Sequence, residues 1–114
     1  MIQARNSNNN QHHFQFHENL VKYNGFEFEL LLLAMLTGLN CILTENQSVQ
    51  NMRGLMIRLE LSTKNVIPKT RSAISFLLSN ELVIRKDHGY LPSKRGKSFG
   101  THLLSILQKN LTTL

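Results

Sequence analysis

The stretch from residue 68 to residue 92, PKTRSAISFLLSNELVIRKDHGYLP, decides the fold of this chain. Its first half, residues 68–80, is predicted to be a helix, because proline suits the first helical turn and apolar residues then recur at helical spacing. The apolar stripe that we expect to be buried comprises Ala73, Ile74, Leu77 and Leu78. The opposite surface carries two bases and no acid, and we expect it to expose Lys69, Thr70, Arg71, Ser72, Ser75 and Ser79.

The second half of this stretch has the pattern of a β-hairpin. Residues 82–86 (LVIRK) and Tyr90 with Leu91 are strand-like. Asp87, His88 and Gly89 lie between them as a three-residue connection, with glycine at the position that needs a left-handed backbone. The sequence therefore predicts a compact hairpin over residues 82–92.

An unusually apolar helix is predicted before this stretch, over residues 26–39. It is apolar on most sides, so we expect it to be central and largely covered by the other helices. Asn24 and Glu27 have the spacing of a capping box at its start, and Asn40 is a plausible stop.

Two further helices complete the predicted fold. One starts after Thr44, with Gln47 in the capping-box position, or after Ser48. Its amphipathic stripe consists of Val49, Met52, Met56 and Leu59. The other covers residues 94–112 and is capped by Ser93.

The length of 114 residues allows one domain. We expect a flexible, polar, Asn-rich arm over residues 1–19 and a single mainly α (α+β) domain over residues 20–114. The longest apolar run, residues 30–43, is shorter than the ~20 residues of a membrane span. The first ten residues lack the hydrophobic middle of a secretory signal. We therefore expect a cytoplasmic protein with no membrane partner.

Charge is concentrated in one part of the chain. The whole sequence has a formal net charge of +6. Residues 53–97 contain ten Lys and Arg against three Asp and Glu, whereas the remainder contains three against four. Such a concentration of positive charge is typical of a surface that contacts a polyanion, whose counterions are released on binding.

The predicted order of helix, helix, helix and hairpin is that of a helix-turn-helix with an added wing. Residues 59–99 also resemble the second half of winged-helix regulators of the MarR and PadR families. The resemblance rests on the paired aliphatic residues of the helix, on the corner NELVI at residues 80–84, and on YLPSKRG at residues 90–96. It implies a winged helix-turn-helix regulator of transcription that binds double-stranded DNA in a sequence-specific way and is associated with the nucleoid.

The chemistry of the side chains suggests their roles in such a complex. Lys69 and Arg71 would reach guanine O6 and N7 in the major groove, and Thr70, Ser72 and Ser75 would contact bases or phosphates. The backbone contacts, which fix the register without reading sequence, would be made by Arg85, Lys86, His88, Lys94, Arg95 and Lys97.

We expect neither an enzyme nor a bound cofactor or metal. The sequence lacks a glycine-rich phosphate loop, a His-Glu-x-x-His motif and a Gly-x-Ser-x-Gly motif. His12, His13 and His17 with Glu18 have a spacing that suits a metal, but they adjoin the Asn-rich arm, so a solvated arm is the better interpretation. Cys41 lies in an apolar run, where a buried and inert thiol is expected.

The last predicted helix has two apolar stripes, which one domain rarely needs. One comprises Leu104, Leu107, Leu111 and Leu114, and the other comprises Phe99, Leu103 and Ile106. This motivates a homodimer formed through residues 94–112 and part of residues 26–39, on a palindromic operator. Two alternatives remain: a winged-helix module that binds an acidic protein partner, and a helical assembly protein.

Overall fold

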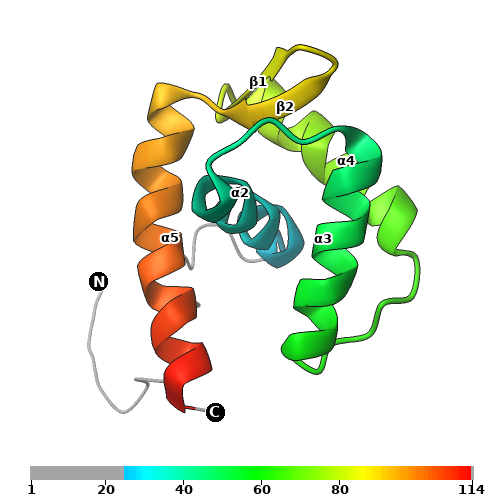
Figure 1. Ribbon diagram of the computed structural model, residues 1–114, viewed down its shortest axis with the longest axis vertical. Coiled ribbons are helices and arrows are strands. Elements are labelled where there is room, and N and C mark those ends of the chain that lie inside the picture. Colours follow the sequence, from blue (N-terminus) through cyan, green and yellow to red (C-terminus); the bar gives the residue numbers. More distant parts are fainter. Residues whose placement is uncertain (1–24, 114) are drawn as a thin grey trace.

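The computed structural model describes the backbone of residues 25–113 and the side chains of residues 25–107. The predicted arm over residues 1–19 lies outside the described residues. The described part contains four helices and one two-stranded antiparallel sheet, which confirms the mainly helical α+β class (Figure 1). None of the described helices has both the length and the apolar character needed to cross a bilayer.

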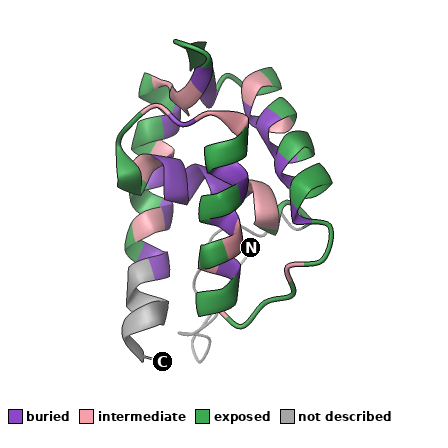
Figure 2. Cartoon of the chain, turned by 45° about the vertical axis from the view of Figure 1, so that its right-hand side comes forward, coloured by how far each residue is buried: buried purple, intermediate pink, exposed green. Residues whose placement is uncertain are grey.

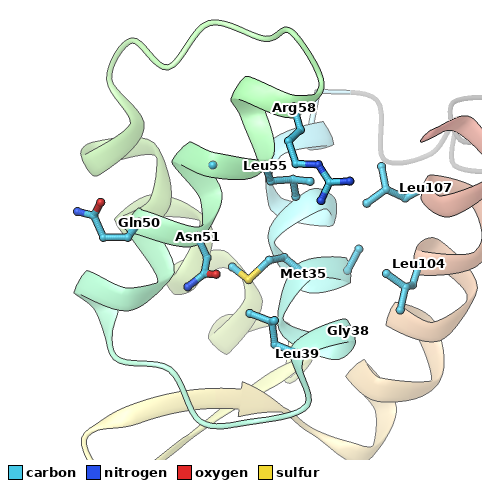
Figure 3. A pocket seen from close by; sticks show the side chains of 11 residues that line it. Met35, Gly38, Leu39, Gln50, Asn51, Leu55, Arg58, Leu104 and Leu107 are labelled. Atoms are coloured by element: carbon cyan, nitrogen blue, oxygen red, sulfur yellow. The ribbon is translucent and has the colours of Figure 1, made fainter. Parts of the chain in front are cut away.

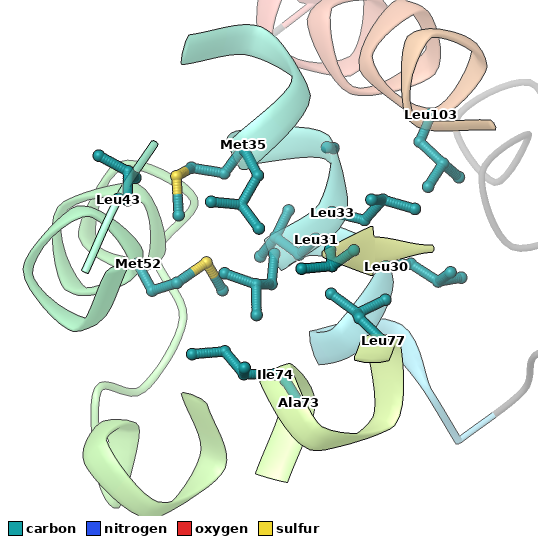
Figure 4. Close-up of a cluster of buried hydrophobic side chains, with 14 of the residues drawn as sticks. Leu30, Leu31, Leu33, Met35, Leu43, Met52, Ala73, Ile74, Leu77 and Leu103 are labelled. Atoms are coloured by element: carbon teal, nitrogen blue, oxygen red, sulfur yellow. The ribbon is translucent and has the colours of Figure 1, made fainter. Parts of the chain in front are cut away.

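Helix α2 (Glu27–Leu39) is the centre of the molecule, as its sequence predicts. It is buried continuously from Leu30 to Leu36, because α3, α4, α5 and the sheet all pack against it. Figure 4 shows Leu30, Leu31 and Leu33 among side chains from the other helices. This arrangement makes α2 the support on which every outer element rests.

The ends of α2 differ in how well the sequence predicts them. Asn40 stops the helix in a left-handed conformation with φ 51°, and its N–H donates to the Leu36 carbonyl, so the predicted stop is confirmed. The start is different, because the N-cap residue is Phe26, whose side chain cannot cap. Instead, the Gly25 N–H donates to the carboxylate of Glu27 at 3.1 Å and 3.2 Å from its two oxygens.

Helix α3 (Glu45–Arg58) begins with the predicted capping box. The Gln47 N–H donates to Thr44 Oγ1 at 3.1 Å, and the Thr44 N–H donates to Gln47 Oε1 at 2.9 Å. Val49, Met52 and Met56 are buried as the stripe predicts, and Leu59 is half-buried. The start of α3 is therefore fixed in place by reciprocal hydrogen bonds.

Helix α4 (Val66–Ser79) starts two residues before the predicted position. Its N-cap is Asn65, in a left-handed conformation with φ 61°, so Pro68 occupies the third helical position rather than the first. Proline is tolerated there, because the N–H groups of the first turn have no partner within the helix. Ala73, Ile74 and Leu77 are buried as predicted, and Leu78 is half-buried.

Strands β1 (Val83–Lys86) and β2 (Gly89–Pro92) form the predicted hairpin, but with a shorter turn. Lys86 pairs with Gly89, so the connection has two residues, Asp87 and His88, both with positive φ (49° and 64°). The prediction that glycine supplies the left-handed position is wrong. A Cβ on Gly89 would lie 2.5 Å from Ile42 Cγ2 and 2.7 Å from the Leu43 oxygen, so glycine allows a close approach of backbones.

That close approach joins the hairpin to the connection between α2 and α3. The Leu43 N–H donates to the Tyr90 oxygen at 3.0 Å, and the Tyr90 N–H donates to the Leu43 oxygen at 2.8 Å. The hairpin is thus held on its β2 side by the residue that precedes the cap of α3.

Helix α5 (Lys94–Thr113) follows directly and is capped by Ser93 as predicted, since the Gly96 N–H donates to Ser93 Oγ at 2.9 Å. The Ser93 hydroxyl in turn donates to the Glu81 oxygen at 2.7 Å. Gly96 is required here, because a Cβ would overlap the Leu82 carbonyl. The first turn of α5 is therefore held against the corner between α4 and β1.

Candidate nucleic-acid interface

The outer surface of α4 is exposed and mostly polar, although Ile67 in its first turn is 45% exposed and one residue predicted on this surface, Thr70, is buried. Lys69, Arg71, Ser72 and Ser75 are exposed, as the sequence predicts (Figure 2 colours exposed residues green). Thr70 is fully buried, so its placement on this surface is wrong. Its position explains why, because Ala73, Ile74 and Leu77 follow at i+3, i+4 and i+7 on the same helical face. The hydroxyl has no hydrogen-bond partner among the residues that the structure describes.

Arg71 does not stand alone on this surface. Its Nε donates to Glu45 Oε2 at 2.7 Å, which joins α4 to the first residue of α3. Sequence reasoning missed Glu45, because 26 residues separate the two and no local spacing relates them. The only signal was that Glu45 is the first residue after the Thr44 cap.

The hairpin adds a second group of exposed cations. Arg85, Lys86 and His88 are all exposed, as expected. The Arg85 guanidinium lies 5.6 Å from the centre of the Tyr90 ring, and its Nη1 donates to the Tyr90 hydroxyl at 3.4 Å. Tyr90 therefore orients one of the cations, a role that the sequence did not indicate.

The first turn of α5 carries the third group. Lys94, Arg95 and Lys97 are exposed, and Arg95 Nη1 donates to the Asn80 oxygen at 3.3 Å. Figure 1 shows this turn on one side of the hairpin and the start of α3 on the other. Arg95 links α5 to the end of α4, the pair of bonds between Leu43 and Tyr90 links the hairpin to the segment before α3, and Arg71 links α4 to α3.

The charges at the N-termini of α4 and α5 do not stabilise these helices in the isolated protein. A helix N-terminus attracts anions, and acidic residues there stabilise a helix by about 0.3–1 kcal/mol each. The first turns of α4 and α5 contain no acid, and the first turn of α5 carries bases instead. Three acids lie nearby, because Glu81 and Asp87 are exposed and Glu45 pairs with Arg71. The arrangement suits a negatively charged partner that supplies the missing anion.

Chemistry of other kinds has less support in the described residues. Within residues 25–107 no group of three His, Cys, Asp or Glu side chains is arranged to hold a metal ion. The histidines at positions 12, 13 and 17 lie outside the described residues. Cys41 is exposed, so the prediction of a buried thiol is wrong. It follows Asn40, where the left-handed stop turns the chain away from the core.

An open groove of about 540 Å³ lies between α2, α3 and α5 (Figure 3). Met35, Leu39, Leu55 and Leu104 line its apolar part, and Arg58 lies at its edge. The groove is separate from the cationic residues of α4 and the hairpin.

The described members of the two stripes on α5 are largely used within the chain. Leu103, Ile106 and Leu107 are buried, and Phe99 and Leu104 are half-buried. Leu104 lies against Gly38 of α2, where a Cβ would be 3.3 Å from its Cδ1. Leu111 and Leu114 lie outside the described side chains.

Comparisons with models of protein families, with curated proteins and with solved structures found no match. The function of the chain therefore has to be argued from its own residues.

Proposed function

We propose that this chain is a winged helix-turn-helix protein that binds double-stranded DNA in a sequence-specific way and regulates transcription. In this assignment α3 and α4 are the helix-turn-helix, α4 enters the major groove, and the β1–β2 hairpin is the wing. The observation that carries the proposal is the row of exposed cations along α4, the hairpin and the first turn of α5. An α-helix with short polar side chains between its bases matches the width of the major groove.

The cations divide into two groups by position. Lys69 and Arg71, with Ser72 and Ser75, lie on the helix that would face base edges, so they are assigned to sequence readout. The remaining set is assigned to phosphates and comprises Arg85, Lys86, His88, Lys94, Arg95 and Lys97. Thr70 is removed from the proposed contacts, because its side chain is buried.

A homodimer remains part of the proposal. The groove lined by Leu39, Leu55 and Leu104 supports it, since 45% of Leu39 is exposed at the end of α2 beside α5. Two copies would present two α4 helices to half-sites about one turn of DNA apart. Light scattering at micromolar concentration tests this part, and a monomer with or without DNA contradicts it.

The test of DNA binding is a titration of the full chain with DNA at two salt concentrations. A protein that makes six to ten phosphate contacts loses about 10³- to 10⁵-fold in affinity between 50 and 200 mM salt. Selection of bound sites from a random DNA pool then tests for specificity and for half-site symmetry. Absence of binding at low salt, or binding without any preferred sequence, contradicts the proposed function.

A second candidate is a winged-helix module that binds an acidic protein. Large apolar side chains lie exposed near the cations, with Ile84 46% exposed beside Arg85 and Ile67 45% exposed two residues before Lys69. Phosphate contacts do not use such residues, whereas protein interfaces do. The same titration distinguishes the two, because this candidate predicts no DNA binding at low salt.

A further inference from the structure

We propose that Glu45 is a specificity-determining residue that positions Arg71 for reading guanine. This inference rests on the proposed DNA-binding function and adds a residue from outside the predicted readout helix. The geometry behind it is the single hydrogen bond from Arg71 Nε to Glu45 Oε2 at 2.7 Å.

The carboxylate is held on a rigid element. Glu45 is the first residue of α3, directly after Thr44, whose side chain and backbone both take part in the capping box. Its negative charge is also favoured by the helix dipole at this end. The backbone that carries this acceptor is thus fixed in place at the start of α3.

The bond leaves the useful part of Arg71 open. A guanidinium has five N–H donors in a planar fork, and Glu45 takes the one on Nε. The two Nη nitrogens have no hydrogen-bond partner among the described residues, and 64% of the side chain is exposed. The Nη pair is the edge that donates to guanine O6 and N7 in a bidentate contact.

Stability is a poor explanation for this ion pair. Exposed pairs of this kind contribute little to folding, because solvent screens them and two long side chains lose freedom. Because the ion pair already restricts the Arg71 side chain, binding to a base costs that side chain less conformational entropy. Fixing Arg71 in advance therefore favours the site where both Nη nitrogens find acceptors.

Glu45 also acts against binding in general. Its side chain is 41% exposed next to a surface that would face phosphates, and a carboxylate repels them. Removing this charge should strengthen binding to any DNA while weakening the preference for guanine. These opposite changes identify a positioning role, because loss of folded protein would lower both affinities together.

The experiment measures affinity for a selected site and for the same site with its Arg71-contacted guanine replaced, using the full chain. For Glu45→Ala, which removes the acceptor of the Arg71 Nε–H, the preference ratio should fall about three- to tenfold, because one side chain is no longer held in advance. The affinity for the substituted site is expected to rise. The ratio comes from one preparation, so a partly unfolded variant does not change it.

Two variants complete the design. Glu60→Ala removes the same charge from an exposed residue just beyond the other end of α3, and it should leave the ratio unchanged. In an Arg71→Ala background, Glu45→Ala should no longer alter the ratio but should still raise general affinity. If the wild type prefers the site and Glu45→Ala keeps the full ratio, the positioning role is overturned alone. If the wild type binds no DNA, the proposed function fails as well.

Discussion

Helices α2 and α4 are almost equal in length, yet they are built on opposite rules. α2 is buried on every side from Leu30 to Leu36, whereas α4 is buried along one stripe and charged along the other. In α2 volume and apolar character determine which residues fit, so many different sequences could form this helix. In α4 the exposed half has no packing role, and its residue types must be explained by what they contact. The comparison separates the part that makes the fold from the part that we assign to function.

The largest expected effect is in α2. Leu33→Ala should lower the free energy of unfolding by about 2–5 kcal/mol, because the fully buried side chain leaves a cavity. Urea unfolding followed by circular dichroism measures this. Leu39→Ala is the matched control on the same helix, and its 45% exposed side chain should cost much less. Equal costs for the two variants would contradict the central position of α2.

The next effect is in the exposed half of α4. Arg71→Ala should weaken binding to the preferred site by about 1–3 kcal/mol and relax the base preference at one position, because a bidentate contact is lost. The free energy of unfolding should change little, since the ion pair with Glu45 is exposed. Competition titrations with single-base variants of the site measure the preference. A uniform loss on all DNA would show that Arg71 contacts phosphate instead.

Thr70 is a polar residue on the buried stripe of α4. Thr70→Val should raise the free energy of unfolding by about 1 kcal/mol, because it removes a buried hydroxyl without a partner and keeps the shape. DNA affinity should stay the same. Thermal or urea unfolding measures the first and a DNA titration the second. Ser72→Ala, at an exposed position, should leave stability within about 0.5 kcal/mol. A loss of DNA affinity in Thr70→Val would show that Thr70 does take part in the DNA contact.

The smallest effect is at the first turn of α5. Lys94→Ala should weaken binding to all DNA alike and reduce the slope of log affinity against log salt by about 0.9, as for one lost phosphate contact. Stability should not fall, because a lysine at this end opposes the helix dipole. Titrations at several salt concentrations give the slope. If Lys94→Ala and Arg71→Ala behave identically, the division between readout and backbone contacts is wrong.

Local sequence signals predicted the parts of the fold that depend on local physics. The capping box of Thr44 and Gln47, the stop at Asn40, the cap at Ser93 and the burial of residues 30–36 were all readable from short windows. The capping box, the stop and the Ser93 cap each involve residues within four positions of one another, where spacing determines contact, and the burial of residues 30–36 follows from their uniformly apolar character. These elements give the helix order and hence most of the architecture.

The predictions that failed concern residues whose surroundings are not set by their neighbours in sequence. The pattern predicts Gly89 in the turn because glycine often supplies a positive φ, but glycine is needed there because Leu43, far away in sequence, approaches it closely. The apolar neighbours of Cys41 predict a buried thiol, whereas Cys41 is exposed after the stop at Asn40. These positions depend on tertiary neighbours that no local pattern reveals.

The candidate site shows both cases together. Exposure of Lys69, Arg71, Ser72 and Ser75 follows from helical periodicity. The same periodicity places Thr70 on the buried stripe of Ala73 and Leu77. Exposure of Thr70 is predicted only from its polar side chain, and that prediction is wrong. The bond from Arg71 to Glu45 joins two helices, so only the assembled structure reveals it.

The two backbone hydrogen bonds between Leu43 and Tyr90 have a mechanical consequence. They prevent the β-ribbon from tilting independently of the segment that leads into α3, and α3 holds the guanidinium of α4 through Glu45. These contacts limit how far the span between the ribbon tip and that guanidinium can change. If the chain binds DNA as proposed, the duplex has to adapt its groove width and curvature to that span, so bendable sequences would be bound in preference to stiff ones.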